Sequence, residues 1–478
     1  MRIKSFTIAR QRWATACCLA LTATLFIGGR AAAFEMEMGA VTVQDTFTVP
    51  AWTNVTFIQA FDSVPLVFAL PTTDGGDPAT LRIRNVSTTG FEIAQVEPSA
   101  NDGPHVAMPT AYLAIEPGDH RLPDGTHIAA FEHSTTSFVN RFISNTWDVV
   151  GYPSAFGASP AVLASIQTMA NESGTPPGTS SVPFMDVAIQ NVSTSTMQVS
   201  LERAESVAGV VAFSERIGLL VVDNLANVSF VDSLGVAAQL QSLATPVNIQ
   251  GYSNGCYSNS YAAAFSATPL AVASATSRQG NNGGWLRRCS QSNSALGLTV
   301  DEDIDNDSER SHISESAGIV ATSVAFHANF DVELTVAKNV VSISDPINGT
   351  TEQRSIPEAT MGYTISVENR GSISPDPGTV VVSEDVPTDL SLCVSATCQA
   401  GGPVVLDTSA SPVPPGISLG SVEYSNNGGL SYVYVPIPDA TGFDDAVDAI
   451  RITLAGTLAS IDPAGAPSFE LRLAARVD

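Results

Sequence analysis

Carboxylates recur at every second position near residue 300, in the run Asp-Glu-Asp-Ile-Asp-Asn-Asp-Ser-Glu. Oxygen ligands at alternate positions are typical of calcium-binding loops. Asn306 replaces the turn glycine of such a loop, and His312 stands where its last glutamate is expected. The alternative is a strand edge or a solvated loop whose charges are balanced by nearby arginines. Calcium is therefore the one cofactor that the sequence suggests, and its candidate ligands are Asp301, Asp303, Asp305, Asp307 and Glu309.

Trp285 is followed closely by Arg287 and Arg288, just upstream of the acidic run. The face of an indole ring can stack on the C–H face of a sugar, and the fork of a guanidinium group suits pairs of hydroxyl groups. These three residues are therefore a candidate sugar-binding platform in which Trp285 supplies the apolar surface. The alternative is a tryptophan that packs in the core beside a structural arginine.

The patterns that could indicate catalysis lack the context that catalysis needs. Residues 416–420 match Gly-x-Ser-x-Gly, but a nucleophile elbow needs a strand before it and a helix after it. Here a proline-rich stretch precedes the match and another β-like run follows, which favours a turn between strands. The six histidines are irregularly spaced and form no His-Glu-x-x-His motif. We therefore expect no enzymatic activity.

The charge of the chain argues against several classes of partner. Its 478 residues include 21 Lys and Arg against 47 Asp and Glu, a net charge of −26. Such a surface repels phosphate backbones and anionic membranes, so nucleic acid is not an expected partner. Because 44% of the residues are apolar and only 14% are charged, the chain is expected to fold rather than to stay disordered.

The first 33 residues have the composition of an export signal. Four basic residues precede the apolar residues 14–28, and three alanines at 31–33 supply a cleavage site. The protein is therefore predicted to be secreted or held at the cell surface, with the periplasm as the alternative. No later segment is long and apolar enough to cross a bilayer, so no transmembrane segment is expected after cleavage.

Three segments about a hundred residues apart share one pattern, which indicates one small domain per copy. In each, Ala-Phe is followed after three more residues by proline and then by an apolar run. Apolar and polar residues alternate with period two around these segments, and β-branched residues dominate, so the copies are predicted to be built of strands. Proline cannot donate to a sheet and is therefore expected at the start of a strand or at a sheet edge. The motif residues are Phe61 and Pro65, Phe156 and Pro160, and Phe265 and Pro269.

The predicted fold is all-β, with three tandem antiparallel β-sandwich modules followed by an immunoglobulin-like sandwich. The modules are expected at residues 34–122, 123–226 and 227–330. The last domain is expected at 331–478, where strand-like runs alternate with proline-rich turns.

Four cysteines lie beyond the predicted signal, an even number that suits disulfides in an exported chain. Cys256 and Cys289 both fall in strand-like runs of the third module, which a sandwich can bring face to face. We therefore predict a disulfide between Cys256 and Cys289 and a second, local one between Cys393 and Cys398.

The modules resemble the H-type lectin domain, most clearly in the first copy. The residues behind this resemblance are VTF at 55–57 with the Ala-Phe and proline motif, LRIRNVSTTGFEI at 81–93 and AYLAIE at 111–116. The resemblance implies six-stranded antiparallel sandwiches that assemble as trimers and bind galactose-type sugars. It also implies that Arg82 or Arg84 corresponds to the sugar-binding arginine of the family, and that the three modules form an intramolecular pseudo-trimer. The tryptophan and histidine that complete the family's site do not follow Phe91.

The last domain resembles the DUF11-type repeat of bacterial surface proteins, through VAKNV at 336–340, IPEATMGYTISVENRGS at 356–372 and VSEDVPTDLS at 382–391. The resemblance implies a spacer without known chemistry, in a bacterial envelope or exported context. The two resemblances together predict an exported carbohydrate-binding or adhesive protein whose partners are glycans or cell-surface components. The alternative is a structural envelope or matrix protein with no specific small ligand.

Overall fold

The structure, a computed structural model, describes residues 24–26, 33–47, 52–98, 104–172 and 182–478. Most of the predicted signal peptide lies outside the described residues. The chain divides into two compact units, one of Phe34–Phe330 and one that joins Met1–Ala33 to Asp331–Asp478. The one helix among the described residues is the short 3-10 helix η1 (Tyr252–Asn254), and all other regular elements are strands. The predicted all-β sandwich fold is confirmed.

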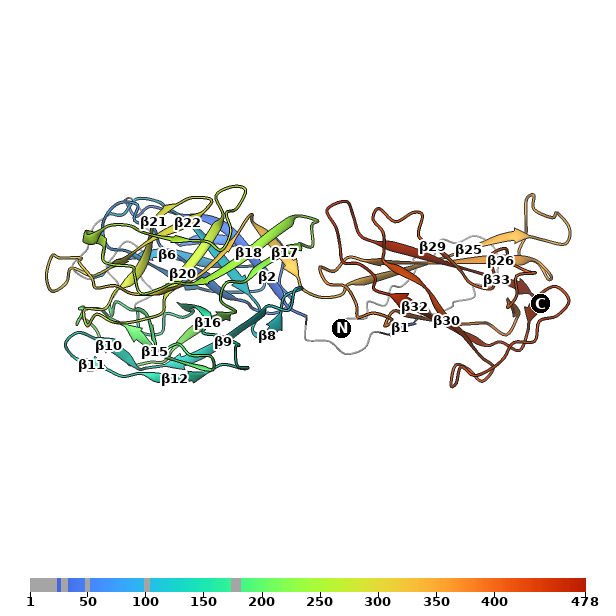
Figure 1. The fold of residues 1–478 in the computed structure, drawn as a ribbon, viewed down its shortest axis with the longest axis horizontal. Helices are drawn as coiled ribbons and strands as arrows, with labels where there is room; N and C mark the ends of the chain where they lie inside the picture. Colours follow the sequence, from blue (N-terminus) through green and yellow to red (C-terminus); the bar gives the residue numbers. More distant parts are fainter. Residues whose placement is uncertain (1–23, 27–32, 48–51, 99–103, 173–181) are drawn as a thin grey trace. The chain divides into compact units, whose positions relative to one another are not determined.

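Each copy of the repeat forms two facing sheets with the same strand order (Figure 1). Apolar side chains from both sheets fill the space between them, as Phe57, Phe91 and Tyr112 do in the first module. The strands of the first module are β2 (Glu35–Val43), β7 (Met108–Ile115) and β4 (Leu66–Ala69) in one sheet, and β3 (Thr53–Thr56), β6 (Gly90–Val96) and β5 (Thr80–Arg84) in the other.

The second and third modules repeat this plan strand for strand. The second also carries β10 (Phe138–Asn140), which pairs in parallel with β15, and β11 (Ser144–Asn145). The strands of the second module are β9 (His127–Thr135), β16 (Glu215–Val222) and β13 (Ala161–Ile166), facing β12 (Asp148–Gly151), β15 (Thr196–Glu202) and β14 (Asp186–Gln190). Those of the third are β18 (Ala237–Ala244), β23 (Ala317–Thr322) and β20 (Leu270–Ala275), facing β19 (Tyr257–Ser260), β22 (Ala295–Asp301) and β21 (Trp285–Gln291).

A fourth strand completes the first sheet of each module, and in the first module it comes from the far end of the unit. β8 (Gly118–Arg121) and β17 (Asn227–Val231) are the local hairpin partners of β9 and β18. The same position beside β2 is taken by β24 (Phe326–Asn329). Strand pairing therefore places β8, which was expected in the first module, in the second sandwich, and β24, which was expected in the third module, in the first.

The repeated sequence motif has one structural role in all three copies. Its proline directly precedes β4, β13 or β20, each of which lies at the edge of its sheet, where a residue without an N–H is tolerated. Its phenylalanine is buried, and the phenylalanine's backbone N–H donates at 2.8 Å to a carbonyl in the turn of the opposite sheet. The donor and acceptor pairs are Phe61 and Thr88, Phe156 and Thr194, and Phe265 and Asn293.

The three modules meet along β4, β13 and β20, which contact one another. Gln167 of the second module exchanges two hydrogen bonds with the backbone of Val67 in the first, at 3.1 and 2.8 Å. Ser274 of the third module does the same with the backbone of Ala164 in the second. Leu70 of the first module packs in the core of the third. Equivalent strands of the three modules thus share one junction.

The second unit is a two-sheet sandwich of its own (Figure 1). Buried and partly exposed residues alternate along β26, the pattern of a strand with one face in the core. One sheet contains β25 (Leu334–Ser344), β26 (Thr360–Asn369), β33 (Ser468–Val477), β28 (Leu390–Cys393), β31 (Phe443–Asp444) and β29 (Val405–Asp407). The other contains β1 (Thr24–Phe26), β27 (Val381–Asp385), β32 (Ala449–Gly456) and β30 (Ile417–Ser425).

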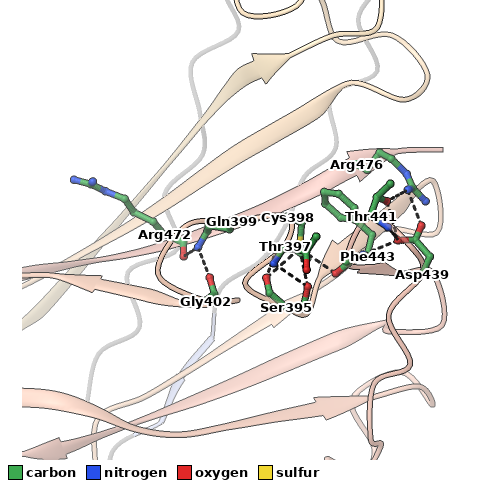
Figure 2. The surroundings of a disulfide bond; sticks show 12 residues. Ser395, Thr397, Cys398, Gln399, Gly402, Asp439, Thr441, Phe443, Arg472 and Arg476 are labelled. Carbon is green, nitrogen blue, oxygen red and sulfur yellow. Dashed lines mark hydrogen bonds and ion pairs between the residues drawn. A yellow bond between two sulfur atoms is a disulfide. The ribbon is translucent and has the colours of Figure 1, made fainter.

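Both predicted disulfides are present. Cys256 is bonded to Cys289 in the third module, and Cys393 to Cys398 in the second unit. Figure 2 shows the surroundings of the second bond, where the Cys398 sulfur lies 2.9 Å from the carbonyl oxygen of Gly442. Two disulfides suit an oxidising compartment. In the part of the chain that the structure describes, no helix has the length and apolarity to cross a membrane.

Candidate functional site at the module junctions

Trp285, the proposed sugar platform, is buried where the three modules meet. Only 3% of its side-chain surface is exposed. It begins β21 of the third module, its indole Nε1 donates to the carbonyl of Ala79 in the first module at 3.0 Å, and its ring lies 4.9 Å from that of Phe184 in the second. The proposed platform is therefore wrong for this conformation, because the indole offers no open face to a sugar.

Arg287 is also fully buried and is used to hold a loop of the first module. Its guanidinium group donates to Asp301 at 2.5 Å and to the backbone carbonyls of Thr72 and Asp77 at 2.8 and 2.6 Å. Arg288 donates to the carbonyl of Pro109 at 2.7 Å, and burial lowers its pKa. These arginine donors therefore serve intermodule contacts rather than a ligand.

Arg82, one of the two arginines that the resemblance proposes, forms a buried ion pair across the first junction. Its Nε lies 2.9 Å from both carboxylate oxygens of Glu172 in the second module, and a terminal nitrogen donates to the carbonyl of Met185. Burial alone would lower the pKa of Arg82, but the charge and hydrogen bond of Glu172 raise it. The pair fastens the second module to the first.

Arg84, the other proposed arginine, is the one sequence-derived candidate that reaches the surface of the first module. Its guanidinium carbon lies 3.9 Å from the centre of the Trp52 ring, and its Nε donates to Glu92 at 2.7 Å. Asn85 donates to the same carboxylate at 2.7 Å. Both Arg84 and Glu92 remain partly exposed, so this group combines an aromatic ring, a cation and an amide at the surface.

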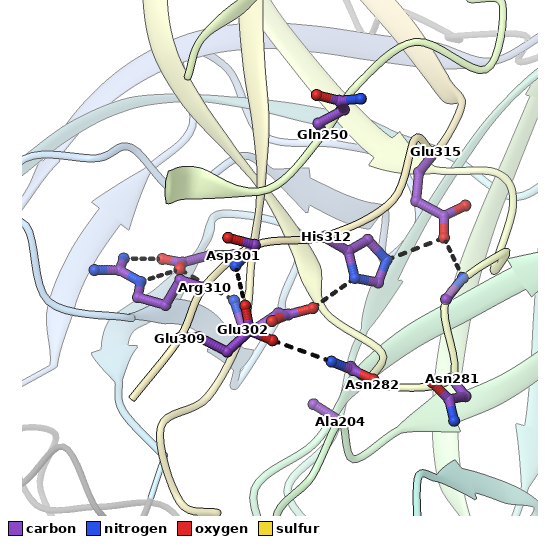
Figure 3. A network of polar contacts seen from close by, with 12 residues as sticks. Ala204, Gln250, Asn281, Asn282, Asp301, Glu302, Glu309, Arg310, His312 and Glu315 are labelled. Atoms are coloured by element: carbon purple, nitrogen blue, oxygen red, sulfur yellow. Dashed lines mark hydrogen bonds and ion pairs between the residues drawn. The ribbon is translucent and has the colours of Figure 1, made fainter. Parts of the chain in front are cut away.

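The carboxylates of the acidic run point to different partners instead of converging on one point. Asp301 is fully buried between Arg287 and Arg310, and both of its oxygens accept from Arg310 at 2.7 Å (Figure 3). Asp303 accepts the backbone N–H groups of Glu205 and Ser206 in the second module, at 2.7 and 3.1 Å. Asp303 and the three carboxylates after it lie beyond the strand, which ends at Asp301.

The outer part of the run is largely exposed, and its carboxylates have separate partners. Glu309 accepts from Asn282 at 3.4 Å and from the Ser311 N–H at 2.8 Å, and Asp307 lies 3.8 Å from Arg141. Among the described residues, no group of three or more His, Cys, Asp or Glu side chains is placed to hold a metal ion. The geometry therefore resembles the arginine-balanced alternative more than a calcium loop.

His312, which stands at the twelfth position counted from Asp301, belongs to a buried polar network (Figure 3). Its two ring nitrogens lie 2.5 Å from Glu302 and 3.1 Å from Glu315. Burial alone would lower the pKa of His312, but these two carboxylates raise it to about 9. Burial raises the pKa of the neighbouring Asp303 to about 7. The network joins the acidic run to the end of the third module.

A small cavity lies where β4, β13 and β20 meet. Equivalent residues of all three modules line it, among them Ala69, Ala164 and Ala273. Its volume is about 40 Å³, enough for a few water molecules but far below the several hundred Å³ of typical small-molecule sites. It does not accommodate a sugar.

The Gly-x-Ser-x-Gly match lies at the start of a strand. Ser418 is the second residue of β30, which pairs with β32, and no helix follows it. The match is thus not a strand-to-helix elbow, and it lies on a strand rather than in the expected turn.

Two partners at these sites escaped the sequence analysis. Trp52 directly precedes the first strand of its sheet. An aromatic residue beside a strand with alternating polar and apolar residues is the sequence feature that could have indicated it. Glu172 lies in a loop of a different module from Arg82, so nothing in the local sequence could pair them. Comparisons with family models, curated proteins and solved structures found no match to this chain. The lectin-like and DUF11-like resemblances therefore stay predictions.

Proposed function

We propose that this chain is an exported structural protein of the cell surface or surrounding matrix, without enzymatic activity. In this proposal the three lectin-like modules act as one body that presents or spaces the second unit. The observation that carries it is the use of Trp285, Arg287 and Arg82, the side chains best suited to a sugar, in buried contacts between modules.

Two further observations support a structural role. The cavity between the modules is too small for a sugar, and Asp301 of the acidic run is paired with Arg287 and Arg310. The net charge of −26 favours solubility and disfavours binding to nucleic acid or to anionic membranes. These features suit a protein whose contacts are with other macromolecules.

A glycan array with the full chain tests the proposal, with and without added calcium. We expect no glycan to be retained above background in either condition. Retention of a defined class of glycan that is abolished by changes at a named surface group would contradict the structural role.

The second candidate function is carbohydrate binding at the surface group formed by Trp52, Arg84, Asn85 and Glu92. An aromatic ring beside hydrogen-bonding side chains is the usual composition of a sugar site, and Arg84 is one of the two arginines proposed from the lectin resemblance. If the array detects binding, Trp52→Ala and Arg84→Ala should each abolish it. Trp147→Ala, at a partly exposed tryptophan of the second module, is the matched control.

A further inference from the structure

An apolar segment of the second unit runs beside β30, to which it is joined by the antiparallel bridge between Tyr424 and Tyr434. The segment comprises residues 430–437 and follows a turn at Gly428 and Gly429, whose φ angles of 72° and 73° favour glycine. It contains no charged residue. Val433, Val435 and Ile437 are 83%, 78% and 75% exposed, far more than aliphatic side chains usually are. We call residues 430–437 the edge segment.

The inner side of the edge segment is anchored. The Tyr434 N–H donates to the carbonyl of Tyr424 in β30 at 3.0 Å, and the Tyr434 hydroxyl donates to Asp444 at 3.0 Å. The Tyr432 ring lies 4.5 Å from the guanidinium carbon of Arg451. The segment is therefore anchored beside β30 at Tyr434 through a single bridge, and such anchoring lowers the entropic cost of pairing with another strand.

The outer side presents unpaired backbone groups. In an antiparallel ladder, alternate residues direct their N–H and C=O groups to the same side. Because Tyr434 faces β30, Val433 and Val435 face outward, and among the described residues their backbone groups have no hydrogen-bond partner. Pro436 and Pro438 have no backbone N–H and cannot donate to β30. The open part of the outer edge is limited to Val433 and Val435, because the N–H groups of Ser431 and Ile437 donate to Asn427 and Asp444 at 3.1 and 2.6 Å.

Another edge strand of this unit, β25, carries features that oppose pairing with a second chain, and the edge segment lacks them. β25 also has a neighbour on one side only, but it carries Lys338 and a register shift between Ser342 and Ser344. A lysine and a bulge on an edge strand oppose pairing with another chain. The edge segment has neither a charge nor a bulge.

We propose that the edge segment pairs antiparallel with the same segment of a second copy of this chain. A twofold axis through Tyr434 places Val433 opposite Val435 of the other copy, and both pairs can exchange N–H and C=O hydrogen bonds. Two copies repel each other over most of their surface, since each carries a net charge of −26. The uncharged edge segment is where they can approach, and this inference does not depend on the proposed function.

The experiment is sedimentation velocity of the full chain, from about 5 to about 200 µM, because so small an interface is expected to be weak. The test variant is the double substitution Val433→Lys and Val435→Lys. The control is Val149→Lys with Val210→Lys, which changes the charge equally at valines of the first unit that are 69% and 75% exposed. Circular dichroism and thermal melting of both variants check that folding is unchanged.

We expect the wild-type chain and the control to form dimers within this range, and the test variant to weaken dimerisation by about tenfold or more. The added lysines reduce the net negative charge of each copy, so a loss of dimers cannot result from greater overall repulsion and points to the like charges placed opposite each other in the paired segments. A wild-type chain that stays monomeric throughout overturns the proposal. Dimers that persist in the test variant overturn it as well, because another surface would then be responsible.

Discussion

Replacing Trp285 with alanine should destabilise the first unit rather than remove a ligand. The side chain is 3% exposed and touches residues of the other two modules. Truncating a buried tryptophan to alanine typically costs about 3–5 kcal/mol. The loss of the indole hydrogen bond leaves the Ala79 carbonyl without that donor, which places the expected cost toward the upper end of the range. Trp285→Phe keeps most of the ring and should cost about 1–2 kcal/mol.

Differential scanning calorimetry of the full chain is the suitable assay, because two compact units need not unfold in one transition. We expect Trp285→Ala to lower the transition of the first unit and to leave that of the second unit unchanged. Trp147→Ala, which removes a partly exposed indole bonded to Asn145 at 2.9 Å, should cost below about 1 kcal/mol. The reasoning is refuted if the first unit of Trp285→Ala unfolds at the same temperature as that of the wild type. The sugar platform regains support if that variant also loses glycan binding.

Three further predictions follow from the junctions and the disulfides. Arg82→Met should lower the free energy of unfolding by about 3–5 kcal/mol, because it removes the cation beside the buried Glu172 carboxylate. Denaturant unfolding of the double variant Arg82→Met with Glu172→Met should show that most of this loss is recovered. A double variant as unstable as the single one would refute this account. The folded-state pKa of His312, about 9, lies above its unfolded value of about 6.5, so its stabilisation is complete below pH 6.5 and is lost as the pH rises to 9. The melting temperature of His312→Gln should therefore fall less steeply with rising pH than that of the wild type between pH 6.5 and 9. Equal slopes would contradict the assignment. The Cys256–Cys289 bond closes a loop with a sequence separation of 33 and should contribute about 3–4 kcal/mol, measured as the loss of stability in the double serine variant, and a loss below about 1 kcal/mol would contradict it.

The sequence was sufficient for the features that depend on local pattern. The repeated proline starts an edge strand in every module because it has no N–H to donate, and the repeated phenylalanine is buried because each copy needs the same core contact. Cys256 and Cys289 were predictable as partners because they lie on runs that read as strands of one sandwich.

The sequence was insufficient for features that depend on contacts between modules. The pattern of Trp285 and Arg287 is the same whether a ligand or a neighbouring module receives their hydrogen bonds, and only the packing of three modules decides between the two. The pairing of Arg82 with Glu172 and the position of β24 beside β2 likewise join residues 90 or more positions apart. No local signal specifies such pairs.

The position of β24 also has a consequence for the order in which the chain acquires its structure. The second and third modules complete their first sheets with adjacent hairpins, β8–β9 and β17–β18, which close as soon as those residues are available. The first module must wait for Phe326–Asn329, almost 300 residues after its own first strand. Contacts so distant in sequence form slowly. During synthesis and export from the N-terminus, the module that emerges first is therefore expected to be finished last, with the open edge of β2 exposed to other chains until β24 arrives.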